Sequence, residues 1–89
     1  MAYSVAWTAA AKRRLQSLPD KVGHVVIEFI YGPMADNPQR IGKNLRLDLA
    51  GLYSARRGDF RIIYTIDEPQ SRVTIVAIEH RSDAYRPRR

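Results

Sequence analysis

Two consecutive segments in the first third of the chain carry apolar residues at helical spacing. In the first, residues 8–18, Thr8 is placed to cap the first turn, and one face carries Ala11, Leu15 and Leu18. The second, at about residues 21–31, has a wider apolar stripe made of Val22, Val25, Val26, Phe29 and Ile30. The pattern predicts two helices joined as a hairpin, each with an apolar face available for packing.

Residues with special backbone preferences set the expected ends of these helices. Pro19 should end the first helix, and Asp20 is placed to cap the second. Gly32-Pro33 should stop the second helix, because proline lacks the amide hydrogen that a helix interior needs. The next residues, 34–44, are rich in turn-forming and polar types, so we expect a loop there.

The remaining segments favour strands. A weak alternation over residues 3–7 predicts a short first strand, and three further strands are expected at about residues 52–57, 60–67 and 72–78, with a turn at 68–71 between the last two. The order β-α-α-β-β-β is typical of an α+β fold. We therefore expect a single domain over residues 1–89, with the helical hairpin packed on one face of an antiparallel sheet.

Gly58-Asp59 is typical of a two-residue hairpin loop, and that loop sets a register for the flanking strands. Arg56 then lies opposite Arg61, and Tyr53 lies opposite Tyr64. Because side chains alternate between the faces of a sheet, the helices should cover the face made of Tyr53, Ala55, Ile62, Tyr64 and Ile66. The other face should carry Ser54, Arg56, Arg61, Ile63 and Thr65.

Two arginines placed directly opposite each other are destabilising unless an anion bridges them. The pair Arg56 and Arg61 therefore indicates an anion site, although the guanidinium groups could also splay into solvent or bind acidic side chains. The turn at 68–71 predicts a second register, in which Asp67 pairs with Arg72, Ile63 with Val76, and Arg61 with Ile78. On this register His80 joins the arginine face and Arg81 points to the opposite face, unless the chain leaves the sheet there.

The charge distribution supports a polyanionic partner. The formal net charge is +6, and residues 40–89 hold 11 of the 15 Lys and Arg but only 6 of the 9 Asp and Glu. The excess therefore lies in the half that should form the sheet, and it consists mainly of arginine, which suits bidentate phosphate contacts and base stacking better than lysine does. General solubility is the simpler explanation of the charge. Nucleic acid, and RNA in particular, is the partner to test first.

Several classes of protein are excluded or disfavoured. The chain has no cysteine, which excludes disulfides, cysteine nucleophiles and thiolate metal sites. It has only His24 and His80, far apart, so no metal is expected, and no cofactor is expected either. The beginning of the chain does not look like a signal peptide, and no apolar run is long enough to cross a membrane. We expect a cytoplasmic protein without a membrane partner.

Two stretches of the sequence resemble the RelE family within the RelE/ParE superfamily of toxin–antitoxin modules. They are Leu49-Ala50-Gly51-Leu52-Tyr53-Ser54-Ala55-Arg56-Arg57-Gly58-Asp59-Phe60-Arg61-Ile62-Ile63-Tyr64-Thr65-Ile66-Asp67 and Ile78-Glu79-His80-Arg81-Ser82-Asp83-Ala84-Tyr85. The resemblance implies the toxin of a type II module, an endoribonuclease that cleaves mRNA in the ribosomal A site. It also implies a RelB-like antitoxin as partner, with operator DNA bound only through that antitoxin.

The resemblance also implies a set of site residues. Arg56 and Arg61 match the family's basic residues on either side of the tight turn, His80 or Arg81 matches a basic residue near the end of the last strand, and Tyr85 matches a tyrosine in the tail. We expect the remaining RNA contacts from Ser54, Arg57 and Arg86. The family often has a second basic residue at the position of Ser54, so this departure leaves the general base open.

The reaction implied is attack of the ribose 2′-OH on the adjacent phosphate, without a metal. Arg56 and Arg61 suit the stabilisation of charge on the phosphorane, but arginine stays protonated and is a poor base. His80 is a candidate base or acid, because histidine gains and loses a proton near neutral pH. Tyr85 is a second candidate, and it could instead stack on a base or pack over the sheet edge.

Two alternatives keep the same fold. One is a ParE-like toxin that inhibits DNA gyrase. The other is an inactive module that binds antitoxin or RNA, which the serine at position 54 supports.

Overall fold

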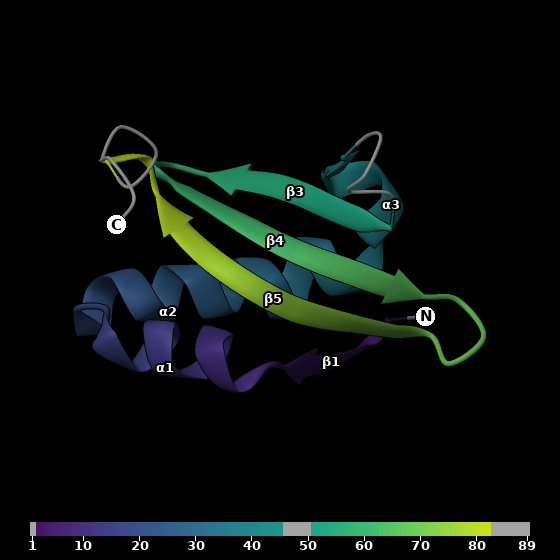
Figure 1. Cartoon of the computed structure of the whole chain (residues 1–89), viewed down its shortest axis with the longest axis horizontal. Helices are drawn as coiled ribbons and strands as arrows, with labels where there is room; N and C mark the ends of the chain where they lie inside the picture. Colours follow the sequence, from purple (N-terminus) through teal and green to yellow (C-terminus); the bar gives the residue numbers. More distant parts are fainter. Residues whose placement is uncertain (1, 46–50, 83–89) are drawn as a thin grey trace.

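The computed structural model describes residues 2–45 and 51–82, and these form a sheet covered on one face by helices (Figure 1). In chain order the elements are β1 (Ser4–Trp7), α1 (Ala9–Ser17), α2 (Asp20–Phe29), the π-helix η1 (Ile30–Met34), α3 (Pro38–Ile41), β2 (Lys43–Asn44), β3 (Leu52–Arg57), β4 (Phe60–Asp67) and β5 (Arg72–His80). The expected α+β fold and its helical hairpin are confirmed. None of the helices in the described ranges is long and apolar enough to cross a membrane.

The sheet has five strands in the order β1-β5-β4-β3-β2, with three long strands at its centre. β3, β4 and β5 are antiparallel neighbours, as predicted, and β2 adds a short antiparallel edge strand. β1 pairs with β5 in parallel, from Ser4 opposite Arg72 to Trp7 opposite Ile75. The prediction of a wholly antiparallel sheet is therefore wrong for β1. No tight turn joins β1 to β5, so no loop imposes the antiparallel direction on this pair.

The first helix begins as the sequence predicted. The Thr8 side chain accepts a hydrogen bond from the Ala11 amide, so it caps α1, and Leu18 lies just beyond the last turn. The second helix differs in its start, since α2 already includes Asp20 and is preceded by Pro19, with no side-chain cap. Proline is well suited to the position directly before α2, because the amide groups at a helix start have no partner within the helix and the missing N–H of proline costs nothing there.

Gly32-Pro33 does not stop the second helix. The chain continues directly from α2 into η1, which contains Pro33. Ile30 and Met34 are fully buried there, and burial of two large apolar side chains outweighs the local preference to stop. The wider π turn also gives the proline ring more room than an α turn would. Residues 34–44, predicted to be a loop, contain η1's end, α3 and β2.

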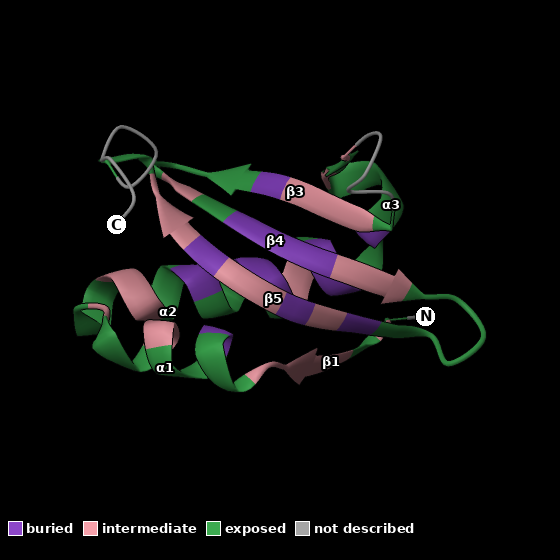
Figure 2. Cartoon of the chain, in the orientation of Figure 1, coloured by how far each residue is buried: buried purple, intermediate pink, exposed green. Residues whose placement is uncertain are grey.

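The core lies between the helices and one face of the sheet (Figure 2). On the sheet side it includes Ala55, Ile62, Tyr64, Val73, Ile75 and Ile78, and on the helix side Ala11, Val26, Phe29, Ile30 and Met34. Tyr53 and Ile66 are half-buried against this cluster. The face that the sequence assigned to the helices is thus confirmed, and Arg56 and Arg61 of the first hairpin lie on the opposite face.

Tyr64 is the largest fully buried side chain of this core. Its hydroxyl donates a 2.7 Å hydrogen bond to the Pro38 carbonyl oxygen. Its ring stacks on Tyr53 with centroids 5.6 Å apart. Burial, with a smaller contribution from Tyr53, raises the pKa of Tyr64 to about 12. Tyr64 therefore stays neutral and works as a structural hydrogen-bond donor that ties α3 to the sheet.

Candidate active site

The hairpin between β3 and β4 has the predicted register. Arg57 pairs with Phe60, Arg56 with Arg61, and Tyr53 with Tyr64. Gly58 has φ of 62°, in the left-handed region that glycine adopts without strain. A glycine in this conformation at the first loop position matches the right-handed twist of the strands. The tight turn therefore holds the two arginines directly opposite each other.

The register between β4 and β5 contains a β-bulge that the sequence reading did not predict. Asp67 pairs with Arg72 as expected, but the pairing shifts between Ile63 and Tyr64, which lie opposite Ala77 and Ile75. The predicted pairing of Ile63 with Val76 is wrong. Beyond the bulge, Arg61 lies opposite Glu79 instead of Ile78. The extra residue lets Val73, Ile75 and Ile78 all face the core, where all three are buried.

The bulge brings a carboxylate to the arginine pair. One terminal nitrogen of Arg61 lies 2.6 Å from Glu79 Oε1, and Arg61 Nε donates to the same oxygen at 3.2 Å. Both side chains remain partly exposed, at 47% and 41%. Arg56 makes no ion pair with any residue in the described ranges. A row of Arg56, Arg61 and Glu79 thus crosses the three central strands on the face away from the helices.

His80 lies on the opposite face from the one predicted. It pairs with Phe60 across the strands, and the two rings meet edge-to-face with centroids 4.9 Å apart. The Ser82 amide donates to His80 Nδ1 at 3.1 Å, and the Ser82 hydroxyl lies 2.8 Å from the same nitrogen. Because Nδ1 accepts a hydrogen bond, the neutral ring carries its hydrogen on Nε2.

Arg81 follows the last residue of β5, so the chain leaves the sheet there, which is the exception that the sequence analysis allowed for its orientation. Its amide donates a 2.7 Å hydrogen bond to the Asp59 carbonyl oxygen. Its guanidinium approaches the Asp59 carboxylate at 3.9 Å, an exposed and weak ion pair. Arg81 therefore lies over the hairpin loop and lines the same pocket as Arg56 and Arg61.

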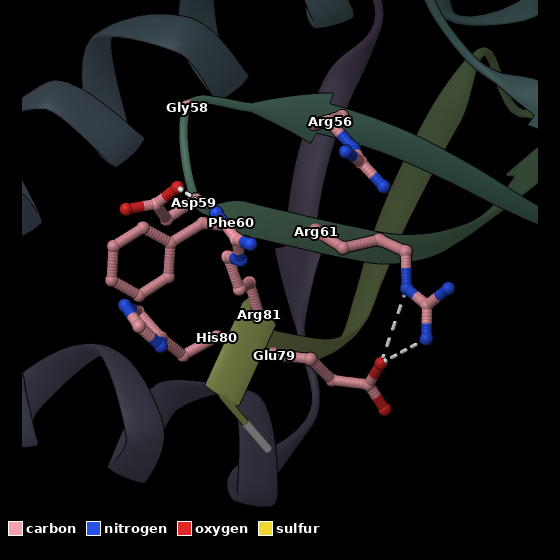
Figure 3. A pocket seen from close by; sticks show the side chains of 8 residues that line it. All are labelled: Arg56, Gly58, Asp59, Phe60, Arg61, Glu79, His80 and Arg81. Carbon is pink, nitrogen blue, oxygen red and sulfur yellow. Dashed lines mark hydrogen bonds and ion pairs between the residues drawn. The ribbon is translucent and has the colours of Figure 1, made fainter. Parts of the chain in front are cut away.

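These side chains surround a pocket of about 270 Å³ at the tip of the hairpin (Figure 3), lined by Arg56, Gly58, Asp59, Phe60, Arg61, Glu79, His80 and Arg81. Four of the five predicted catalytic residues line it. In the close-up Arg61 and Glu79 point toward one another, whereas His80 lies beside the Phe60 ring, on the other side of the Arg81 side chain. The pocket thus has an arginine–glutamate side and a histidine side.

The predicted RNA contacts are more dispersed. Ser54 shares the arginine face, since it lies opposite Ile63, but it does not line the pocket. Arg57 lies on the helix-covered face and borders a separate groove of about 290 Å³ beside α2. Tyr85 and Arg86 lie outside the described residues.

Sequence reasoning missed Glu79. Alternation along the strand places Glu79 on the face opposite to that of His80. The β-bulge shifts the register so that this face is the one that carries Arg61. Arg56 and Arg61 can bind a phosphate group together, and the Glu79 carboxylate would then lie next to that phosphate. Within residues 2–45 and 51–82, no group of three or more His, Asp or Glu residues could hold a metal ion.

Comparison with known proteins places this chain in a family. The model of the family described as ParE toxin of type II toxin–antitoxin system, parDE, matches residues 5–85. The toxin RelE of Mycobacterium tuberculosis is 54% identical over 84 residues, which are 94% of this chain and 87% of that protein. The chain belongs to the RelE family of type II toxin–antitoxin toxins. The resemblance noted from the hairpin and tail motifs is confirmed.

Other RelE-family relatives agree in sequence and fold. The toxin RelG of M. tuberculosis is 44% identical over 86 residues, covering 97% of this chain and 99% of that protein. In the crystal structure of the RelBE2 toxin–antitoxin complex from M. tuberculosis, the matched chain is 42% identical with a TM-score of 0.88, over 93% of this chain and 95% of that one. The isolated RelE toxin of E. coli, 15% identical with a TM-score of 0.74 over 94% of this chain and 92% of that one, shares the fold.

Proposed function

We propose that this RelE-family toxin is a metal-independent endoribonuclease that cleaves mRNA in the ribosomal A site. The observation that carries the proposal is the cross-strand pair of Arg56 and Arg61 at the wall of a pocket, with Arg81 beside them. Such a cluster of like charges weakens an isolated hairpin. Binding of a phosphodiester would turn the same cluster into a favourable arrangement.

The reaction is attack of the ribose 2′-OH on the adjacent phosphorus, which yields a 2′,3′-cyclic phosphate and a 5′-OH end. Arg56 and Arg61 would hold the phosphate oxygens and stabilise the charge that develops on the phosphorane. Removing one donor of this kind from an active site typically costs about 10²–10³ in rate. Arg81, which is loosely held by Asp59 at 3.9 Å, can turn toward the RNA backbone.

His80 is better placed to donate a proton than to accept one. Its Nδ1 already accepts from the Ser82 amide, so Nε2 carries the hydrogen. When the ring takes up a second proton, Nδ1 can donate to the Ser82 hydroxyl 2.8 Å away, and Nε2 remains a donor. We assign His80 to protonation of the leaving 5′-oxygen. Tyr85 is proposed to stack on a base of the mRNA, and Ser54, Arg57 and Arg86 to contact the RNA outside the pocket.

The partner that controls this activity is proposed to be a RelB-like antitoxin. One support is that the 42% identical chain was solved within a RelBE2 toxin–antitoxin complex. An acidic antitoxin segment lying over Arg56 and Arg61 would exclude mRNA from the pocket. Operator DNA would then be bound through the antitoxin, and not by this chain alone.

Substituting Arg61 by alanine tests the nuclease proposal. Purified toxin added to a cell-free translation extract is expected to produce new mRNA ends within translated codons, and Arg61→Ala should reduce their formation by about 10²-fold or more. Arg72→Ala is the matched control, since Arg72 lies at the far end of β5, opposite Asp67. Full cleavage by a folded Arg61→Ala protein, shown by circular dichroism, would contradict the role of this face.

A gyrase inhibitor is the second candidate, because the matching family model is named for ParE toxins. It predicts DNA breaks that depend on gyrase and mRNA that stays intact. An inactive binding module predicts ribosome or RNA binding without new ends. The end-mapping experiment separates both from the nuclease.

A further inference from the structure

The pocket contains a carboxylate whose role the arginine chemistry leaves unexplained. Glu79 lies directly opposite Arg61 on the phosphate-binding face that we propose. A negative charge beside a phosphodiester weakens binding of the phosphodiester, so binding alone does not explain a glutamate at this position. The inference below rests on the proposed nuclease function and concerns the missing general base.

The hydrogen bonds of Glu79 are arranged asymmetrically. Oε1 receives both contacts from Arg61, at 2.6 and 3.2 Å. Oε2 makes no hydrogen bond to any side chain or amide of the described residues. The side chain of Glu79 is 41% exposed and lines the pocket, so its carboxylate can meet a ligand there. Arg61 therefore orients the carboxylate and leaves one of its oxygens available.

Arg61 keeps enough donors to bind a phosphate at the same time. A guanidinium has five N–H donors, of which Nε–H and one hydrogen on a terminal nitrogen are directed at Glu79. The other three hydrogens, together with those of Arg56, remain for phosphate oxygens. One arginine can thus hold the carboxylate and the scissile phosphate side by side, which places the carboxylate near the ribose next to that phosphate.

The other groups of the pocket are poorly suited to accept a proton. The arginines stay protonated, and Nδ1 of His80, which also lines the pocket, already accepts a hydrogen bond from the Ser82 amide. Asp59 belongs to the loop and is directed at Arg81. Among the described residues that line the pocket, Glu79 is the carboxylate on the row of the two arginines.

We propose that Glu79 is the general base of the cleavage reaction and accepts the proton of the ribose 2′-OH. The proton moves to Oε2 as the 2′-oxygen forms its bond to phosphorus. The bond from phosphorus to the 5′-oxygen breaks, and that oxygen takes the Nε2 proton of a doubly protonated His80 ring, which is left neutral with its remaining hydrogen on Nδ1. Glu79 then loses its proton to water and His80 regains one, so both groups return to their starting states without any further reactant.

The substitution Glu79→Gln separates this role from two simpler ones. Glutamine keeps a carbonyl oxygen that can accept from Arg61, but it cannot accept a proton. A residue that only positions Arg61 would tolerate the change. A carboxylate that only repels RNA would, when neutralised, give faster cleavage or tighter binding. Glu28→Gln is the matched control, because Glu28 lies on α2 in an exposed pair with His24, 3.1 Å away.

The measurement is single-turnover cleavage of mRNA in a reconstituted translation system, together with binding of the same mRNA carrying a 2′-deoxynucleotide at the cut site. We expect Glu79→Gln to slow cleavage by about 10²–10⁴-fold, the usual contribution of a general base. Its affinity for the deoxy mRNA should be equal to or higher than that of the wild type. Glu79→Asp, which keeps the carboxylate, should cleave at least tenfold faster than Glu79→Gln.

Several outcomes would overturn the assignment. Cleavage by Glu79→Gln near the wild-type rate would leave Glu79 only a positioning role, and faster cleavage would make it a brake on binding. A Glu79→Asp protein no faster than Glu79→Gln would show that a carboxylate is not what the reaction needs. If the wild-type toxin itself leaves the mRNA intact while Glu28→Gln and the wild type are both folded, the nuclease proposal fails, and this is visible before any Glu79 variant is compared.

Discussion

At the scale of single residues, Gly42 leaves room for the Tyr64 hydroxyl group at the edge of the sheet. The Tyr64 hydroxyl is buried and donates to the Pro38 carbonyl. Gly42 follows α3 with φ of −125°, so its backbone would accept other residues. A Cβ at position 42, however, would lie 2.2 Å from the Tyr64 hydroxyl oxygen and 2.9 Å from the Ser54 carbonyl oxygen. Glycine is needed here for space, not for backbone freedom.

We expect Gly42→Ala to lower the free energy of unfolding by about 1–3 kcal/mol, a typical cost of overpacking. Urea denaturation measures this, with Gly32→Ala as the control because a Cβ there meets nothing within 4 Å. In a Tyr64→Phe background the cost of Gly42→Ala should be smaller, since the closest atom is gone. Equal costs in both backgrounds would rule out the hydroxyl as the source of the clash.

At the scale of elements, α1 is joined to the bulge in β5 through Thr8. The Thr8 side chain caps α1, and its hydroxyl donates to the Val76 carbonyl at 3.2 Å. The Thr8 amide also donates to the Ile75 carbonyl at 3.0 Å. Val76 is the residue that the bulge leaves out of the pairing with β4. The helix cap thus also stabilises the irregularity that turns Glu79 and Arg81 toward the pocket.

Thr8→Ala is expected to destabilise the toxin by about 0.5–2 kcal/mol, the usual cost of losing an N-cap. Loss of the hydrogen bond to the carbonyl of the half-buried Val76 should place the value in the upper part of that range. Thr8→Ser keeps the hydroxyl and should remain within about 0.5 kcal/mol of the wild type. Chemical denaturation of the three proteins checks this, and a stable Thr8→Ala protein would show that the cap and the bulge are supported by other contacts.

At the scale of the whole molecule, charge and apolar surface are separated. The helices cover one face of the sheet, and the opposite face carries Arg56 and Arg61. The helical side also exposes apolar residues, with Val25 41% and Tyr31 52% accessible. An antitoxin that inhibits this toxin would therefore use apolar contacts on the helices and acidic residues over the arginine face.

Binding of the antitoxin is expected to weaken as salt is raised. Increasing ionic strength from about 0.1 M to about 1 M shortens the screening length from about 10 Å to about 3 Å, so exposed charge pairs lose most of their attraction. Calorimetric titration across this range measures the dependence, and a variant with alanine at positions 56 and 61 should show a shallower one. An affinity that does not change with salt would exclude charge as the main means of blocking the pocket.

Features set by neighbours along the chain were predictable from the sequence. Thr8 capped its helix, the predicted apolar stripe faced the core except at the exposed Val25, and Gly58-Asp59 produced the pairing of Arg56 with Arg61. Each depends on contacts within a few residues, where a cap, a helical period or a two-residue loop leaves few alternatives. The family resemblance rested on the same local motifs and was confirmed.

Tertiary packing decided the rest. Burial of Ile30 and Met34 carried the helix through Pro33, and the parallel pairing of β1 with β5 joined segments about seventy residues apart. The bulge at Val76 moved Glu79 and Arg81 into the pocket and placed His80 beside Phe60. A strand with apolar residues at 73, 75, 76 and 78 fits more than one register, and the sequence alone does not rank them. In the fold, the register is the one that buries Val73, Ile75 and Ile78 under the helices, and this register determines which groups line the pocket.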